Sequence, residues 1–99
     1  MNTRLMALDY IKRAKRFFKE AKGDYAEEDY PVTVRRAQEC VELSLKSALR
    51  SIGVEYPREH DVSRALEMTK DKFPDWFVAK IPAFRKISRD LSKERGPAV

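Results

Sequence analysis

The amino-acid sequence predicts an all-α fold, an up-and-down bundle of four to five helices built on a long antiparallel helical hairpin. Apolar residues recur at steps of three and four through most of the 99 residues, which is the period of a helix face. No segment alternates apolar and polar residues, and no Asn-Gly or Asp-Gly hairpin turn occurs. A chain of this length has room for one hydrophobic core, so we expect residues 1–99 to form a single domain.

The first helix is expected from Thr3, a suitable N-cap residue, to about Ala26. Gly23 is one candidate for its C-terminal end, but a glycine inside a helix costs only about 1 kcal/mol, so the helix can continue toward Glu28. The residues that share its apolar face are Ala7, Tyr10, Ile11, Ala14, Phe17, Phe18, Ala21 and Tyr25.

The second helix is expected to follow a turn at Asp29-Tyr30-Pro31 and to run to about Ile52, where Gly53 stops it. Pro31 suits the first turn of a helix because the N–H that it lacks has no partner there. The apolar face of this helix is wide, which is typical of a central helix. It comprises Val34, Ala37, Val41, Leu45, Ala48, Leu49 and Ile52.

Shorter helices are expected in the rest of the chain. A loop around Pro57 leads to an N-cap at His60 or Asp61 and to a third helix that continues in helical period to Phe73. Pro74 ends this helix, and residues 75–81 form a short helical turn with Trp76 and Phe77. Pro82 opens a last helix whose apolar residues are Phe84, Ile87 and Leu91.

The composition excludes several classes of protein. With 37% charged residues, 42% hydrophobic residues and only three glycines, the chain is expected to fold. No apolar run approaches the roughly 18 residues of a membrane span, and charged residues interrupt the N-terminal segment, so we expect a cytoplasmic protein. One cysteine and one histidine cannot form a disulfide framework and make a poor zinc site. We therefore expect no metal and no cofactor.

A basic strip runs along the first helix at spacings of three and four, beside the apolar face. It consists of Lys12, Lys15, Arg16, Lys19 and Lys22. With a net charge of +5 for the chain, the strip is either a phosphate-binding surface for nucleic acid or an ordinary solvated helix face. No aromatic residue is expected within it to stack on bases.

A polar strip runs along one edge of the apolar face of the second helix. It consists of Arg35, Gln38, Glu42 and Lys46, with Glu42 placed four residues before Lys46 so that the two can pair. The opposite edge carries small residues that would let another helix approach closely, and we interpret them as packing residues. They are Thr33, Cys40, Ser44, Ser47 and Ser51.

The evidence for catalysis is weak. His60 next to Asp61 is either an acid–base pair, half of a metal site, or a helix cap, and capping is the interpretation that we favour. Cys40 falls in the middle of a helix, and the sequence has neither a Gly-x-Ser-x-Gly elbow nor a phosphate-binding glycine loop. Binding of a partner is therefore favoured over catalysis.

Residues 35–62, RRAQECVELSLKSALRSIGVEYPREHDV, resemble the core of a HEPN domain, named for nucleotide binding in higher eukaryotes and prokaryotes. The resemblance includes Arg36-Ala37-Gln38, Val41-Glu42-Leu43, Ile52-Gly53, and Pro57 before His60-Asp61-Val62. The fold that it implies is a bundle of four or five helices, usually a homodimer. Many prokaryotic members act with a minimal nucleotidyltransferase as a toxin–antitoxin pair, and others cleave RNA.

RNA-cleaving members of the family carry an arginine and a histidine with four to six residues between them, and this sequence departs from that pattern. Gly53, Val54 and Glu55 occupy the positions that would hold the arginine before His60. We therefore expect a HEPN homodimer without nuclease activity that pairs with a nucleotidyltransferase, with RNA or a nucleotide as an alternative ligand. The residues predicted to bind the partner or ligand are Arg35, Gln38, Glu42, Lys46 and His60, and the first four face either the partner or the dimer cleft. Two alternatives remain, a metal-independent ribonuclease with a variant site around His60 and a nucleic-acid-binding domain that uses the basic strip.

Overall fold

The computed structural model describes residues 3–55 and 61–95, and these residues form helices and turns with no strand among them. The all-α prediction is therefore confirmed. The elements in chain order are α1 (Thr3–Ala26), α2 (Tyr30–Ser51), α3 (Val62–Met68), a 3₁₀ turn (Lys70–Lys72), α4 (Asp75–Val78) and α5 (Ile81–Arg95).

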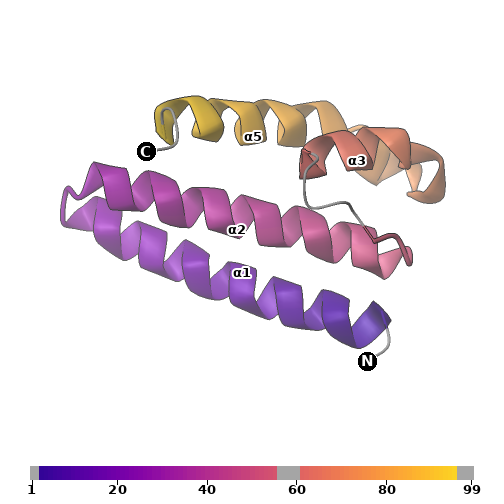
Figure 1. The fold of residues 1–99 in the computed structure, drawn as a ribbon, viewed down its shortest axis with the longest axis horizontal. Helices are drawn as coiled ribbons and strands as arrows, with labels where there is room; N and C mark the ends of the chain where they lie inside the picture. The colour runs from indigo at the N-terminus through magenta and orange to yellow at the C-terminus, as the bar shows by residue number, and fades with distance from the viewer. Residues whose placement is uncertain (1–2, 56–60, 96–99) are drawn as a thin grey trace.

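The helix α2 is central, as its wide apolar face predicts. It forms a long antiparallel hairpin with α1 on one side, while α3 and α5 pack along its other side (Figure 1). The three long helices thus lie side by side, and the molecule measures 40 × 27 × 25 Å. Among the residues that the structure describes, no further long helix packs on α2, so the two sides of α2 that face neither α1 nor α3 and α5 are not fully covered.

The turn between α1 and α2 is made by Glu28 and not by Gly23. Glu28 has a left-handed backbone with φ of 61°, and its N–H bonds to the carbonyl of Tyr25 while the N–H of Asp29 bonds to the carbonyl of Asp24, both at 3.0 Å. These two bonds form a Schellman motif, which satisfies carbonyls at the helix end. Gly23 therefore lies inside α1. Of the two predicted ends of this helix, the one at Gly23 was wrong, and the helix continues toward Glu28.

The ends of α2 have the expected caps. Asp29 accepts a hydrogen bond from the backbone N–H of Val32 at 3.4 Å, and Pro31 occupies the first turn. At the other end Gly53 has φ of 76°, and the N–H of Val54 bonds to the carbonyl of Leu49 at 3.0 Å. This is a second Schellman motif, here with the glycine that its left-handed position favours.

The segment after residue 60 differs in part from the prediction. Asp61 is the N-cap of α3, since its carboxylate accepts from the N–H of Ser63 at 2.9 Å, while His60 lies outside the described residues. The α-helix ends at Met68 and not at Phe73, and a 3₁₀ turn follows it. At this end the N–H and the hydroxyl of Thr69 both donate to the carbonyl of Ala65, at 3.1 and 2.8 Å. Phe73 is extended, as the residue before a proline prefers.

The core has two parts with different side chains. Between α2, α3 and α5 it consists of Leu45, Leu49, Val62, Leu66 and Ile81. Between α1 and α2 it is thin, because the buried residues of α1 are only Ala7, Ala14 and Ala21, one every two turns. Small residues at this spacing let the two helices approach closely.

Two of the aromatic residues expected on the apolar face of α1 are mainly exposed. Phe18 is 55% and Tyr25 is 65% exposed. The Tyr25 ring contacts that of Tyr30 at the start of α2, with the ring centres 5.8 Å apart, but neither aromatic side chain is buried. The periodicity therefore predicted too wide a buried face for α1.

Candidate partner-binding site

The polar strip of α2 forms one side of a cavity between α2 and α5. Gln38 donates from Nε2 to Ser92 Oγ of α5 at 3.2 Å, and Lys46 Nζ lies 3.4 Å from Glu42 Oε1. The Lys46 side chain is only 20% exposed, whereas that of Glu42 is 51% exposed. The strip therefore has a fixed amide in its middle and an accessible carboxylate beside it.

The cavity next to the strip has a volume of about 360 Å³ and a mixed polar and apolar lining. Its polar groups are Gln38, Glu42, Asp61, Ser88 and Ser92. The carboxylate of Asp61 is engaged in capping α3, since it also accepts from Ser63 Oγ at 2.8 Å. Ser88 and Ser92 also line the cavity, but neither was predicted as a site residue. Serines are common on exposed helix faces, so these two could be assigned to a site only once the position of α5 beside α2 was known.

The other predicted site residues lie further apart. Arg35 is exposed and lines a separate hollow at the end of α2 with Tyr30, Val34 and Glu94. His60 lies outside the described residues. The structure therefore brings Gln38 and Glu42 into one cavity, places Lys46 beside Glu42 in the next turn, and leaves Arg35 at the far end of the strip.

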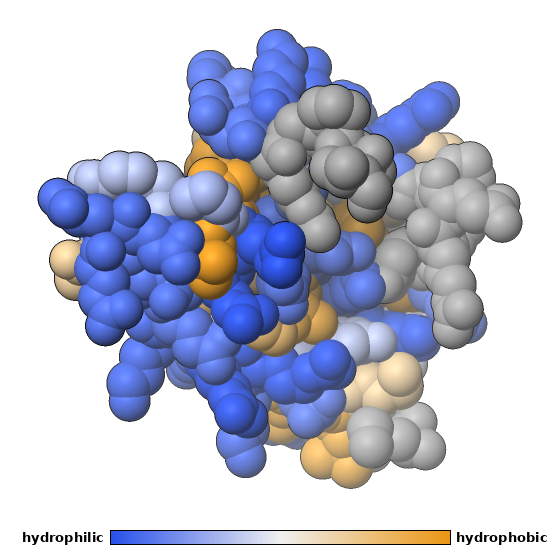
Figure 2. All heavy atoms as spheres, turned by 60° about the vertical axis from the view of Figure 1, so that its left-hand side comes forward, coloured by the Kyte–Doolittle hydropathy of each residue, from blue (hydrophilic) through white to orange (hydrophobic). Residues whose placement is uncertain are grey.

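All five residues of the basic strip are exposed on α1. Arg16 pairs with Glu20 at 3.6 Å, but no carboxylate of the residues that the structure describes lies within ion-pair distance of Lys12, Lys15 or Lys19. In the view of Figure 2, hydrophilic side chains cover most of the surface, and apolar atoms appear between them in small areas.

One aromatic residue does accompany the basic strip. The Lys22 ammonium lies 4.8 Å from the centre of the Phe18 ring, within cation–π distance. Since Phe18 is exposed, the expectation that the strip has no aromatic residue was wrong. The error has the same cause as above, since Phe18 was predicted to lie on the buried apolar face of α1.

An ion-pair network closes the seam between α1 and α2 on the polar-strip side. Arg36 Nε lies 3.4 Å from Glu20 of α1, and its Nη1 lies 3.6 Å from Glu39. The Arg36 guanidinium also lies 5.9 Å from the centre of the Phe17 ring. Partly exposed pairs of this kind contribute about 1 kcal/mol or less each, so the network orients the hairpin more than it stabilises it.

Cys40 is half-buried on α2. Burial raises the pKa of its thiol above the ordinary value, and a hydrogen bond with Ser44 offsets only part of this rise. Among the residues described, no group of three or more His, Cys, Asp or Glu side chains could hold a metal ion. No helix among the same residues is long and apolar enough to cross a membrane.

The antiparallel hairpin, the central helix with its polar strip and the cavity against α5 define a small helical domain with surfaces for binding. The family model of the HEPN domain matches residues 7–98, nearly the whole chain. The chain belongs to this family, which confirms the resemblance found in residues 35–62 and supports a helical domain of nucleotide-binding or nuclease-like type. No curated protein and no solved structure matches the chain.

Proposed function

We propose that this protein is a cytoplasmic HEPN homodimer that acts as the toxin-like half of a two-component pair with a minimal nucleotidyltransferase and has no nuclease activity of its own. The family match along residues 7–98 carries the proposal. The sequence adds support, because Gly53, Val54 and Glu55 stand where the nuclease arginine would precede His60. In addition, neither Arg85 nor Arg89 is followed by a histidine at the family spacing, since residues 90–92 are Asp-Leu-Ser and residues 94–96 are Glu-Arg-Gly.

The polar strip of α2 is the surface that we assign to the nucleotidyltransferase. It presents a carboxylate and an ammonium that are held next to each other, an amide fixed by Ser92, and the exposed Arg35. Charges in such an arrangement contribute mainly specificity and encounter rate, because only a partner with the complementary order of charges matches them. The adjoining cavity offers room for a side chain of that partner.

A charge exchange tests this assignment without removing the local ion pair. In the double variant Glu42→Lys/Lys46→Glu the pair at spacing four remains, so stability should change by only a few tenths of a kcal/mol. The order of charges that the partner meets is inverted, however, and its affinity should fall about tenfold or more. The matched control is Lys12→Glu/Lys19→Glu on α1, which should leave this affinity unchanged.

The measurement is co-purification with the nucleotidyltransferase encoded beside this protein, followed by titration calorimetry on the variants. Unchanged affinity in the exchanged variant would remove the polar strip from the partner surface. If no nucleotidyltransferase is recovered, the two-component proposal fails. RNA cleavage that His60→Ala abolishes would instead establish the variant ribonuclease.

A second candidate function is nucleic-acid binding through the basic strip. It is favoured by the three lysines that have no carboxylate nearby and by the exposed Phe18 ring, which can stack on a base. Binding through lysine–phosphate contacts weakens steeply with salt because counterions are released. We expect Lys12→Glu/Lys19→Glu to reduce both the affinity for single-stranded RNA and its salt dependence, whereas an affinity that is independent of salt would rule the function out.

A further inference from the structure

The cavity beside the polar strip is acidic, although the chain as a whole has a net charge of +5. Three elements supply its polar groups. These are Gln38 and Glu42 of α2, Asp61 at the start of α3, and Ser88 and Ser92 of α5. Two of them are carboxylates, and none of the described residues in the lining is a lysine, an arginine or a histidine. The cavity therefore favours a ligand with positive charge.

Hydrogen bonds to neighbouring groups fix several of these acceptors. Ser92 Oγ accepts from Gln38 Nε2 at 3.2 Å, which joins α5 to α2 at the cavity. Asp61 accepts from the N–H and the hydroxyl of Ser63 at 2.9 and 2.8 Å, both through Oδ1. Among the described residues, no hydrogen bond or ion pair uses Asp61 Oδ2. The carboxylate is thus held in place by one oxygen while the other can accept from a ligand, and such preorganisation lowers the cost of binding.

One basic side chain next to the cavity offsets part of its negative charge. Lys46 Nζ lies 3.4 Å from Glu42 Oε1, one turn along α2 from the lining residues. Glu42, Asp61 and Lys46 together still carry one more negative than positive charge. Moreover, the Glu42 side chain is 51% exposed and that of Lys46 only 20%, so an approaching ligand meets the carboxylate more readily than the ammonium.

The rest of the cavity wall is apolar and limits what can enter. It is formed by Val41, Leu45, Val62 and Leu91, of which Leu45 and Val62 belong to the buried core. Charges interact more strongly beside such a wall than in open water, because the local dielectric constant is lower. The volume of about 360 Å³ is near the lower end of the range for ligand pockets, about 300 to 1,000 Å³. It suits one long side chain better than a whole nucleotide.

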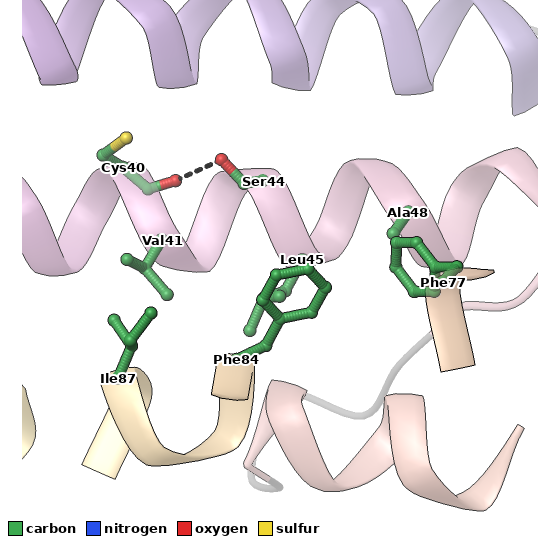
Figure 3. A pocket seen from close by; sticks show the side chains of 8 residues that line it. All are labelled: Cys40, Val41, Ser44, Leu45, Ala48, Phe77, Phe84 and Ile87. Carbon is green, nitrogen blue, oxygen red and sulfur yellow. Dashed lines mark hydrogen bonds between the residues drawn. The ribbon is translucent and has the colours of Figure 1, made fainter. Parts of the chain in front are cut away.

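A second hollow, of about 290 Å³, lies between the same two helices and has a different lining. Figure 3 shows Val41 and Leu45 on the side of α2 that faces α5, and these two residues line both hollows. None of the described residues that line the second hollow is charged. The hydroxyl of Ser44 at its edge already donates to the carbonyl of Cys40 at 2.8 Å. This hollow offers nothing that holds a charged group, so it provides an internal control.

We propose that the cavity beside the polar strip binds the guanidinium group of an arginine that the partner protein inserts. A guanidinium has five N–H donors in a planar fork, and the lining offers it the carboxylates of Glu42 and Asp61 and the hydroxyls of Ser88 and Ser92. The aliphatic part of the arginine packs on the apolar wall. The inference rests on the proposed function and names the chemical group of the nucleotidyltransferase that this cavity accepts.

Two other occupants fit the cavity less well. A nucleotide would bring its phosphates next to the carboxylates of Glu42 and Asp61, which repel them, and the described lining has no basic side chain to bind them. A lysine has the right charge, but its three donors are on one atom and cannot form the paired contacts of a planar fork. Arginine is the side chain whose charge, donors and aliphatic length all have counterparts in the lining.

Titration with N-acetylarginine amide at millimolar concentration, followed by NMR of the amide signals, tests the cavity without the partner. The signals of Gln38, Ser88 and Ser92 should move, while those of Ala48 and Phe77 at the second hollow should not. N-acetylcitrulline amide, which has a neutral urea group in place of the guanidinium, should bind at least tenfold more weakly. An equal response to the two probes, or no response of the cavity signals to the arginine probe, would overturn the inference.

Two substitutions remove the charges of the cavity and keep its shape, namely Glu42→Gln and Asp61→Asn. Asparagine caps a helix as well as aspartate does, so α3 should keep its start, which circular dichroism checks. Each variant should bind the arginine probe and the nucleotidyltransferase about tenfold more weakly. The matched control is Asp9→Asn, because Asp9 is 55% exposed and pairs with Arg13 at spacing four, as Glu42 pairs with Lys46. An equal loss in the control would show an effect of net charge alone and overturn the site.

The failure of this inference can be separated from failure of the proposed function. If the arginine probe binds as expected but no nucleotidyltransferase is recovered, the two-component proposal fails and the arginine site remains. If the nucleotidyltransferase binds Glu42→Gln and Asp61→Asn as tightly as the unmodified chain, the arginine site is overturned and the two-component proposal remains. Adenosine monophosphate that moves the signals of Gln38, Ser88 and Ser92 would overturn the site in favour of a nucleotide.

Discussion

Ser47 of α2 donates its hydroxyl to the backbone carbonyl of Ala7 in α1 at 2.7 Å, and both residues are buried. The bond joins the two longest helices, and the buried residues of α1 along this contact are all alanines. A larger residue at either position would separate the helices, since the contact is formed through small side chains. The thin half of the core is therefore held by close approach and by this one buried polar contact.

Ser47→Ala should destabilise the fold by about 1 kcal/mol, the net contribution of one hydrogen bond. The carbonyl of Ala7 lies within α1, so the helix still provides it with a donor and no larger penalty is expected. The measurement is urea unfolding followed by circular dichroism. Ser51→Ala is the control, because the Ser51 hydroxyl bonds only to Ala48 in its own helix and is exposed. Equal losses in the two variants would contradict the role assigned to Ser47.

Leu49→Ala should cost about 2–5 kcal/mol, because its side chain is fully buried among Val62, Leu66 and Ile81 and its removal leaves a cavity. Leu8→Ala on α1 is the matched control in the same pair of residue types, because Leu8 is 56% exposed. Its effect on the unfolding free energy should be small, because little apolar surface is lost from the core. A large loss in the monomer would show that Leu8 belongs to the core.

Glu28→Gly should stabilise the protein by about 1 kcal/mol, because Glu28 occupies a left-handed conformation that glycine adopts without a steric penalty. The reverse experiment is Gly53→Ala at the other Schellman turn, which should destabilise by a similar amount although its Cβ would meet no atom within 4 Å. Thermal unfolding of both variants checks the pair. A loss of stability in Glu28→Gly would mean that the carboxylate itself contributes to the turn.

The pH dependence of stability should contain a contribution from Cys40. Burial raises the pKa of its thiol in the folded protein, so the unfolded chain loses this proton first as the pH rises through about 8.5. The stabilisation is fully present below that pH and is lost as the pH increases toward the folded pKa. The unfolding free energy of the unmodified chain should therefore fall more steeply in alkali than that of Cys40→Ser. Parallel curves would exclude the contribution.

Much of the fold followed from local physics. Apolar spacing predicted both long helices, with the end of the first left open between Gly23 and Glu28, and Pro31, Gly53 and Asp61 have the roles at helix ends that their chemistry favours. The early end of α3 was missed, because a 3₁₀ turn at Lys70–Lys72 follows it and helical period does not distinguish such a turn from a continued α-helix.

The residues 3–55 and 61–95 show that the sequence by itself determined where the helices lie and which family the chain belongs to, since both depend on patterns along the chain. Only the tertiary structure decided which side of each helix is covered. Phe18 and Ala14 have the same periodicity, but one is exposed and the other buried. The physical reason is that α1 packs through a narrow row of alanines, while Ser88, Ser92 and Glu94 acquire their neighbours on α2 only when α5 is placed along that helix.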